Sequence, residues 1–481
     1  MTPSAVSAPE PAGATPPARA ALVRSLGVRD LVLLNVVAVT SLRWMATSAA
    51  AGPSSLVLWA IAGLFFFVPE GLVVSELTTR YPDGGGVYSW TKRAFGDGHG
   101  FFCGWCYFTN NLLYPANLLL STAVIFTYAI GQDHTALGSS WTYVLGVTLL
   151  LLWIATIVNI VGLQSGKWLQ NVGAVCTFLP GLILVALGGY AMMTHPSANR
   201  FDAGQLVPHF DNFSEINLWA SIAFAFTGLE LSATMCDEIK EPRRSLPRAV
   251  LLSAPLIAGI YILGTVSVLW LVPSKDVNVV SGFLQSIKAG ATLASPALLV
   301  IVPLCALMFT IGNLGGVGAW LNGPARVAFM IGLDRYFPRA FAKIHPRYKT
   351  PHIAILFEAI VATIFLLLSA LGKGTTVERA YLILLDTMIL LYFIPFVYMF
   401  LAYIKLTATG AVVSTPRRLI VGWSGALVTV VGMIVACVPP SDTPSVMVFE
   451  LKVVGGALAF VVLGLVVYRR GARAGRAAAR A

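Results

Sequence analysis

Two stretches decide the fold of this chain: Asn35-Val-Val-Ala-Val-Thr-Ser-Leu-Arg-Trp-Met-Ala-Thr-Ser48 and Ala223-Phe-Ala-Phe-Thr-Gly-Leu-Glu-Leu-Ser232. Each lies inside an otherwise apolar run. The first places Arg43 in the middle of its run, and the second places Gly228 and Glu230 there. A helix that stops inside a membrane frees backbone N–H and C=O groups, which need new partners. Both stretches therefore predict helices that are broken halfway along their length.

Apolar residues dominate the rest of the chain as well. Of its 481 residues, 57% are hydrophobic and 11% are charged, with a mean hydropathy of +0.80, whereas soluble domains are about 25% charged. A helix that crosses a bilayer needs about 20 mostly apolar residues. The sequence predicts an all-α polytopic membrane protein with twelve transmembrane helices, at residues 30–51, 53–78, 99–130, 139–161, 169–193, 214–236, 246–272, 293–320, 351–370, 379–403, 417–438 and 445–468.

The basic residues predict the orientation of these spans. If the N-terminus lies in the cytoplasm, 25 of the 32 Lys and Arg residues fall in cytoplasmic segments, six fall in the opposite loops, and Arg43 lies inside a span. Cytoplasmic loops of membrane proteins carry such an excess. We therefore expect a multi-pass protein of the inner, cytoplasmic membrane with both termini in the cytoplasm. The net charge of +11 has this source, so no nucleic-acid partner is predicted.

The spans divide the chain into four regions. Residues 1–29 contain no apolar signal segment and predict a disordered cytoplasmic tail. Residues 30–403 predict a core of two five-span halves, about 30–193 and 214–403, and the two interrupted spans come first in each half. Residues 404–468 hold helices 11 and 12, and residues 469–481 form a basic cytoplasmic tail. Interruptions at corresponding positions of two halves indicate the binding site of a transporter.

Cysteine and histidine residues indicate no cofactor. Cys103-Gly-Trp-Cys106 has the spacing of a redox pair, but it opens an apolar run with no βαβ pattern around it. Helix packing is the preferred interpretation, with a redox or metal role as the alternative. The six histidines show no paired metal-binding spacing. We predict no metal site and no cofactor.

Six motifs, in the loops and in the third and sixth spans, carry a resemblance to a known family. They are Glu76-Leu-Thr-Thr-Arg-Tyr-Pro-Asp-Gly-Gly-Gly-Val-Tyr-Ser-Trp-Thr-Lys-Arg-Ala-Phe-Gly96, Gly100-Phe-Phe-Cys-Gly-Trp105, Phe224-Ala-Phe-Thr-Gly-Leu-Glu230, Asp237-Glu-Ile-Lys-Glu-Pro-Arg-Arg-Ser-Leu-Pro-Arg248, Gly323-Pro-Ala-Arg326 and Asp334-Arg-Tyr-Phe-Pro338. Together they resemble the amino acid–polyamine–organocation superfamily of transporters. Ala46-Thr47-Ser48 also looks like its glutamate/GABA antiporter branch.

This resemblance implies a LeuT-type inverted repeat of five plus five helices, followed by two C-terminal helices, with helices 1 and 6 discontinuous. It also implies alternating access around a site between spans 1, 3, 6, 8 and 10. The residues expected to bind substrate there are Ser41, Arg43, Trp44, Thr47, Asn110, Asn111, Tyr114, Phe224, Thr227, Gly228 and Asn313.

Several of these residues have a second interpretation. The polar groups of Asn110, Asn111 and Tyr114 suit inter-helix hydrogen bonds as well as a pocket, and close helix packing explains the glycines around Asn313. The resemblance implies that Phe224 is a gating aromatic, although an aromatic in an apolar helix usually only packs. The charged loop at residues 237–248 is expected to be a solvated hinge or gate rather than a site.

Three acidic or basic residues are expected to work inside the membrane. The resemblance implies a gating or proton-sensing role for Glu230; the alternative is a carboxyl that only holds the broken helix. Asp386 is expected to act as a proton relay. Arg43 would either form an ion pair with Glu70, Glu230, Glu358 or Asp386, or bind a substrate carboxylate, or replace a coupling cation. Some relatives place a Lys in span 5 at the sodium position, where this chain has Ala174-Val-Cys-Thr177.

The predicted function is secondary transport of amino acids, by exchange or by proton-coupled symport. The predicted partners are an amino acid, membrane lipid and protons, and the protein is expected to be a monomer or a homodimer. A carrier of polyamines or other organic amines and a non-transporting sensor on the same fold are the alternatives. An enzyme is not predicted, because no nucleophile–base pair or metal cluster lies at one depth in the sequence.

Overall fold

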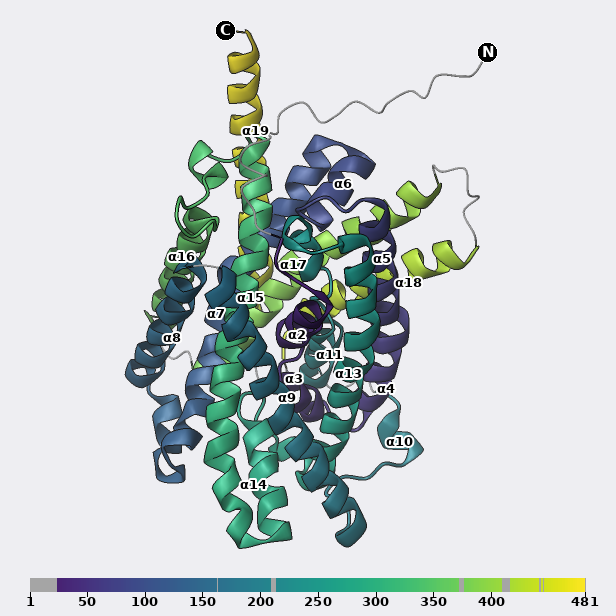
Figure 1. Ribbon diagram of the computed structural model, residues 1–481. Coiled ribbons are helices and arrows are strands. Elements are labelled where there is room, and N and C mark those ends of the chain that lie inside the picture. The colour runs from purple at the N-terminus through teal and green to yellow at the C-terminus, as the bar shows by residue number, and fades with distance from the viewer. Residues whose placement is uncertain are drawn as a thin grey trace.

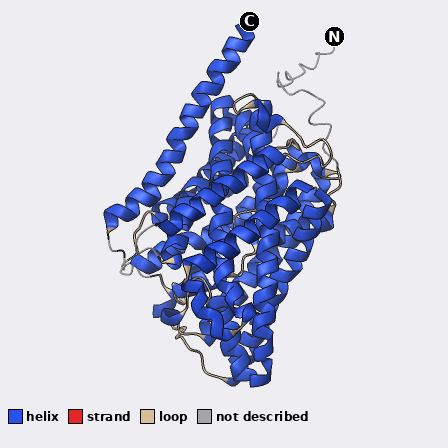
Figure 2. Cartoon of the chain, turned by 90° about the vertical axis from the view of Figure 1, so that its left-hand side faces the viewer, coloured by secondary structure: helices blue, strands red, loops and turns tan. Residues whose placement is uncertain are grey.

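The computed structural model describes residues 24–161, 163–208, 213–371, 376–408, 416–440, 443 and 445–480. These residues form a bundle of helices, with no strand among them (Figures 1 and 2). We call the end that carries α6 (Val87–Phe95) and the end of α19 (Val446–Arg480), at the top of Figure 1, the inner end. The opposite end, which carries α14 (Gly282–Ala294), is the outer end. Both names follow the predicted orientation.

The predicted spans appear in order along the chain. They are α2 (Val28–Val39) with α3 (Arg43–Ala50), α4 (Ser54–Ala62) with the π-turn Gly63–Phe67 and α5 (Val68–Arg80), α7 (Asp97–Ile130), α8 (Trp141–Val161), α9 (Leu163–Thr194), α11 (Phe213–Ala225) with α12 (Leu231–Thr234), α13 (Pro242–Leu271), α15 (Ile301–Leu333), α16 (His352–Leu371), α17 (Val377–Ala408), α18 (Pro416–Ala436) and α19. Shorter elements connect them: α10 (Ala203–Leu206), α14 and the 3₁₀ turns Gln132–Ser139, Cys236–Glu238, Ser274–Asp276, Pro296–Val300 and Arg339–Ala342.

Eleven helices in the described part of the chain are long and apolar enough to cross a membrane. The sixth predicted span, which forms α11 and α12, is not among these eleven. The prediction of an all-α polytopic membrane protein with discontinuous helices 1 and 6 is confirmed. Two short helices, α6 and α14, were not predicted as separate elements, because they lie in the connections between spans.

Both breaks have a backbone that cannot continue a helix. At the first break, Thr40 is extended, with φ −74° and ψ 109°. At the second, Gly228 has φ +128°, a conformation that residues with a Cβ rarely adopt. A Cβ on Gly228 would also lie 3.0 Å from Val39 Cγ2 and 3.2 Å from Trp320 Cζ2. Glycine is therefore required here both for its conformation and for its size.

A single tyrosine joins the two breaks. The hydroxyl of Tyr261, on α13, accepts a hydrogen bond from Ser41 N (3.1 Å). The same hydroxyl lies 2.5 Å from Val39 O and 3.2 Å from Ala225 O, and its one proton can be donated to either carbonyl. Three backbone groups freed by the breaks thus meet one side chain. Since unpaired backbone groups inside a bilayer are costly, Tyr261 stabilises both interruptions at once.

Replacing Tyr261 by Phe should destabilise the protein without leaving a cavity. The change removes the acceptor for Ser41 N and the donor that Val39 O and Ala225 O share, so we expect the free energy of unfolding to fall by about 1–3 kcal/mol. Thermal unfolding of the purified protein in one detergent measures the effect. The matched control is Tyr143→Phe, because the hydroxyl of Tyr143 has no hydrogen-bond partner in the described structure. Equal unfolding temperatures for the two variants would contradict the role of Tyr261.

Candidate functional site

Arg43 opens α3 at the first break and is completely buried. Its Nη1 donates to Asn117 Oδ1 at 2.6 Å, and its guanidinium carbon lies 4.3 Å from the ring centre of Trp44. The rings of Tyr381 and Tyr114 lie 5.5 and 5.8 Å away. Aromatic faces attract such a cation, so these rings offset part of the cost of its burial.

One edge of the Arg43 guanidinium has no partner. Nε and Nη2 make no hydrogen bond within the described structure. Arg43 also forms no ion pair with any described carboxylate, including Glu70, Glu230, Glu358 and Asp386, which were the four expected alternatives. The Nε–Nη2 edge of arginine is the edge that binds a carboxylate with two parallel hydrogen bonds. Arg43 therefore offers a buried receptor for an anionic group.

Other polar atoms near the first break are also unsatisfied. Buried atoms without a hydrogen-bond partner include Thr40 Oγ1, Ser41 Oγ, both amide atoms of Asn110 and the hydroxyl of Tyr381. Most buried polar atoms in proteins are paired, and an unpaired one needs an explanation. A polar ligand between α3, α7 and α17 would supply partners for this group of atoms.

The face of α7 that meets the first break carries polar residues at helical spacing. Tyr107, Asn110, Tyr114 and Asn117 follow one another at intervals of three or four residues, which places them on one side of the helix. Asn117 also donates through Nδ2 to Tyr381 O (2.8 Å) and so links α7 to α17. Asn117 was not predicted, although the same spacing from Asn110 and Tyr114 could have identified it.

Two glutamates hold the second break. Glu230 Oε2 accepts a hydrogen bond from Gly228 N (2.9 Å), and Glu70 Oε1 on α5 accepts one from Leu229 N (3.1 Å). Glu230 Oε1 accepts hydrogen bonds from the hydroxyls of Tyr107 (3.2 Å) and Tyr392. The two carboxyl groups thus accept from consecutive backbone N–H groups of the break. Glu70 was expected only as one possible partner for Arg43.

Aromatic rings connect the two breaks across the bundle. Phe224 lies edge-on to Trp44 (5.8 Å between ring centres) and to Tyr392 (5.9 Å). Trp320 on α15 contacts Tyr114 at 4.9 Å and Tyr392 at 5.7 Å. The predicted gating residue Phe224 thus lies between the Arg43 region and the Glu230 region, where it can respond to a ligand.

The remaining predicted residues lie in different surroundings. Thr47 Oγ1 donates to Arg43 O or to Val279 O, Asn111 donates to Tyr107 O, and Thr227 donates to Phe224 O. Asn313 donates to Thr122 on α7 (2.8 Å), and Asp386 accepts from Asn217 on α11 (3.2 Å). No hydrogen bond or ion pair in the described structure links Asn313 or Asp386 to Arg43 or Glu230.

A cavity of about 560 Å³ lies on the outer side of Arg43. Its lining includes Val124 and Tyr128 at the outer end of α7, Asn278 and Val280, and Val377 at the start of α17. Residues next to this lining reach the first break: Thr47 Oγ1 lies 3.1 Å from Val279 O, and Asn117 Nδ2 lies 2.8 Å from Tyr381 O.

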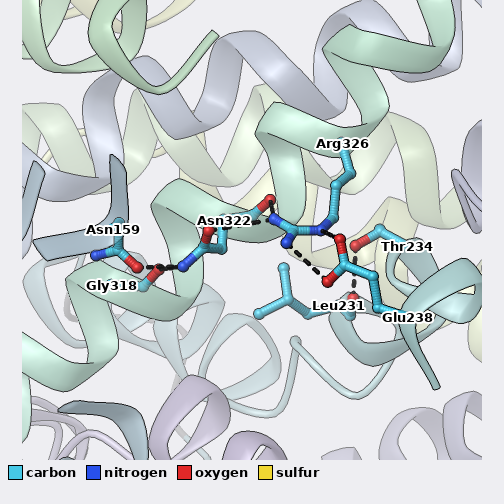
Figure 3. A network of polar contacts seen from close by, with 7 residues as sticks. All are labelled: Asn159, Leu231, Thr234, Glu238, Gly318, Asn322 and Arg326. Atoms are coloured by element: carbon cyan, nitrogen blue, oxygen red, sulfur yellow. Dashed lines mark hydrogen bonds and ion pairs between the residues drawn. The ribbon is translucent and has the colours of Figure 1, made fainter. Parts of the chain in front are cut away.

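A buried ion pair joins α15 to the 3₁₀ turn Cys236–Glu238 (Figure 3). Arg326 on α15 donates through Nε and Nη2 to the two carboxylate oxygens of Glu238, both at 2.8 Å, and the side chains are 4% and 2% exposed. Arg326 Nη1 donates to Asn322 O (2.6 Å), and Asn322 reaches Asn159 on α8. This chain of contacts joins the segment after α12 to α15 and α8. We call Arg326 and Glu238 the inner lock.

The loop that contains Glu238 was expected to be solvated. That expectation is wrong for Glu238, which finds a bidentate partner under α15, and it is correct for Glu241 and Arg244, which are 73% and 76% exposed. The backbone of this loop also holds the start of the first span. Leu26 N donates to Glu238 O (3.1 Å), and Lys240 N donates to Leu26 O (2.9 Å).

The described residues contain no group of three or more His, Cys, Asp or Glu side chains placed to hold a metal ion. Cys103 of the Cys-x-x-Cys sequence is buried where α7 meets α6, and Thr91 Oγ1 donates to its Sγ at 3.3 Å. This surrounding is that of a residue packed between helices.

Replacing Glu238 by Gln should open the inner lock. The change leaves the buried guanidinium of Arg326 without its counter-charge, so we expect the free energy of unfolding to fall by about 3–5 kcal/mol. Glu241→Gln is the matched control, since its ion pair with Arg244 is exposed and 3.8 Å long; its effect should stay within about 0.5 kcal/mol. Unfolding of both variants in one detergent tests this, and equal effects would contradict a buried lock.

Comparisons with known proteins agree with this architecture. The amino acid permease family matches residues 26–460. An uncharacterised transporter of Legionella pneumophila is 30% identical over 91% of this chain and 95% of its own length. A probable agmatine/putrescine antiporter of Lactococcus lactis is 26% identical (91% and 93% covered), and a glutamate/gamma-aminobutyrate antiporter of that species is 23% identical (79% and 77% covered). The chain is therefore a multi-pass membrane protein that belongs to the amino acid permease family, within the amino acid–polyamine–organocation superfamily.

Proposed function

We propose that this protein is a secondary active transporter of amino acids, which works by alternating access in the cytoplasmic membrane with both termini inside the cell. The observation that carries the proposal is the free Nε–Nη2 edge of Arg43, buried at the first break beside other unpaired polar atoms. A buried charge without a partner is costly. A substrate carboxylate that binds this edge would remove that cost.

The two breaks suit the two ends of a zwitterion. A carboxylate binds the guanidinium with two hydrogen bonds, and the N-terminal end of the half-helix α3 adds a favourable dipole. An ammonium group suits carbonyl oxygens of the unwound segments, which can accept a second hydrogen bond. The rings of Trp44, Tyr114 and Phe224 border this space and would exclude water from a bound substrate.

The closures at the two ends support alternating access. The inner end is sealed by the buried lock of Arg326 and Glu238, whereas a cavity of about 560 Å³ approaches Arg43 from the outer end. We propose that entry from outside requires movement at Thr47 and Asn117, whereas release to the inside requires that Arg326 and Glu238 separate. Exchange fits the names of the Lactococcus lactis relatives, which are both antiporters.

A second proposal is a carrier of organic amines. It is favoured by the probable agmatine/putrescine antiporter, which is 26% identical over 91% of this chain. A substrate with two amino groups and no carboxylate would meet the unneutralised charge of Arg43, and like charges repel strongly in a buried site. We therefore favour substrates that carry a carboxylate.

Arg43 variants test the carboxylate receptor. Arg43→Ala should abolish transport. Arg43→Lys keeps the charge but cannot present two parallel N–H groups to a carboxylate. A lost hydrogen bond to a charged group costs about 1.5–3 kcal/mol, so we expect KM to rise by about 10- to 100-fold. Initial uptake rates in proteoliposomes measure KM. Arg200→Lys is the matched control, because that side chain is 87% exposed. Normal transport by Arg43→Ala would overturn the proposal.

A substrate panel tests the function as a whole. Proteoliposomes are loaded with or without unlabelled substrate, and uptake of labelled amino acids, agmatine and putrescine is measured at several pH values, with and without sodium. We expect uptake of an amino acid that is faster with internal substrate and that agmatine does not inhibit. Uptake of diamines alone would support the amine carrier. No uptake of any compound would contradict a transport function.

A further inference from the structure

We propose that the inner end of α19 and the loop between α15 and α16 together bind the headgroups of anionic phospholipids. We call this site the inner basic patch; its residues are Arg335 and Arg339 of the loop and Arg469, Arg470 and Arg473 of α19. The patch shares no residue with the region around Arg43 or with either break. The inference does not rest on the proposed substrate, so the failure of one leaves the other standing.

The loop between α15 and α16 carries an unbalanced positive charge. Its one acidic residue, Asp334, already accepts hydrogen bonds from Lys92 Nζ (2.7 Å) and from the hydroxyl of Tyr88. The five basic residues of the loop are exposed and form no ion pair with any described side chain; they are Arg335, Arg339, Lys343, Arg347 and Lys349. The protein itself therefore supplies no counter-charge for this loop within the described residues.

The last helix brings three more basic residues to the inner end. Figures 1 and 2 show that α19 runs along the outside of the bundle and that its C-terminal end extends beyond the other helices. Its apolar residues face outward: Val462 and Leu465 are 57% and 44% exposed. Arg469, Arg470 and Arg473 follow directly, and all three are exposed. Positive charge thus begins where the apolar surface of α19 ends.

A pair of stacked tyrosines joins the loop to the helix. The rings of Tyr336 and Tyr468 lie 5.3 Å apart and are nearly parallel. A Cβ on Gly471 would lie 2.8 Å from Tyr336 O, so the backbone of α19 approaches the loop closely. Arg335 and Arg469 each adjoin one of the stacked tyrosines in the sequence. The two groups of basic residues therefore meet at one place on the surface.

The general excess of Lys and Arg at the inner end does not explain this patch. That excess predicts only the orientation of the protein, and many of its members have acidic partners nearby. Such pairs are Arg80 with Glu76 (2.6 Å), Arg93 with Asp83 (2.8 Å), Lys167 with Asp30 (2.7 Å) and Arg418 with Glu76 (3.0 Å). The inner basic patch differs from these regions because its charge is left for a partner outside the chain.

An anionic phospholipid fits this surface best. Basic residues immediately inside a transmembrane helix attract anionic headgroups, and a guanidinium binds phosphate through two parallel hydrogen bonds. Arg469 and Arg473 are four residues apart on a helix, so they lie on one face and can converge on one phosphate. A soluble acidic partner would also meet this charge, but it would not cover the apolar surface of α19 that adjoins the patch. Lipid chains cover that surface while their headgroups reach the arginines.

A lipid titration of charge-removing variants tests the site. The protein in an uncharged detergent receives phosphatidylglycerol or phosphatidylcholine, and its melting temperature is measured against lipid concentration. We expect phosphatidylglycerol alone to raise the melting temperature of the wild type. The variants R335Q/R339Q and R469Q/R473Q should each need about 10- to 30-fold more phosphatidylglycerol for half of the effect, because each basic residue contributes a factor of about five.

The matched control is R243Q/R244Q, which removes two exposed basic residues at the start of α13. Arg244 lies 3.8 Å from Glu241 there, so this region has its own counter-charge. The control should change the half-maximal lipid concentration by no more than about twofold. An equal effect of the control and the patch variants would overturn the inference, as would an effect of only one of the two patch variants.

Two further arms identify the partner and the force. Inorganic phosphate or polyglutamate that protects the wild type as well as phosphatidylglycerol does would overturn the lipid assignment. Salt keeps the inference testable if a variant is unstable without lipid, because this arm uses the wild type only. The screening length falls from about 10 Å in 0.1 M NaCl to about 3 Å in 1 M NaCl, so protection by phosphatidylglycerol should weaken. Undiminished protection at the higher concentration would overturn the inference.

Discussion

The need to pair every backbone N–H and C=O group inside a bilayer governs this structure. Within the described residues, the first and the sixth predicted spans are interrupted and cannot meet that need within their own helices. Their freed groups are satisfied by side chains from other helices: the hydroxyl of Tyr261, the indole of Trp320, which donates to Ala38 O, and the carboxyls of Glu70 and Glu230. Each of these side chains therefore fixes the position of a neighbouring helix relative to a break.

This sharing makes the breaks sensitive to their surroundings. A continuous helix keeps its hydrogen bonds when its neighbours shift, whereas a broken one loses partners. At the first break some polar atoms have no hydrogen-bond partner in the described structure, among them Arg43 Nε and Nη2. We propose that a bound substrate supplies these partners. At the second break the partners are the carboxyls of Glu70 and Glu230, which accept from Leu229 N and Gly228 N. Tyr261 contacts backbone groups of both interruptions.

The sequence alone predicts much of the fold, because hydropathy and interruptions are local properties. The spans, both breaks and the burial of Arg43 all follow from residues that are neighbours in the chain. The roles of Tyr261, Asn117, Glu70 and Glu238 could not be predicted, because each depends on which helix packs against it. Glu238 illustrates the reason. It lies in the same charged loop as Glu241, which is exposed, and Glu238 is buried because it pairs with Arg326 on α15.

Gly228 limits how this protein can diversify. A residue with a Cβ would be strained at its positive φ, and that Cβ would lie 3.0 Å from Val39 and 3.2 Å from Trp320. A substitution at this position would therefore disturb the second break itself. Variation has to arise at neighbours whose side chains have space or free atoms, such as Ser41 and Asn110. Differences between descendants should therefore accumulate around an invariant glycine rather than at it.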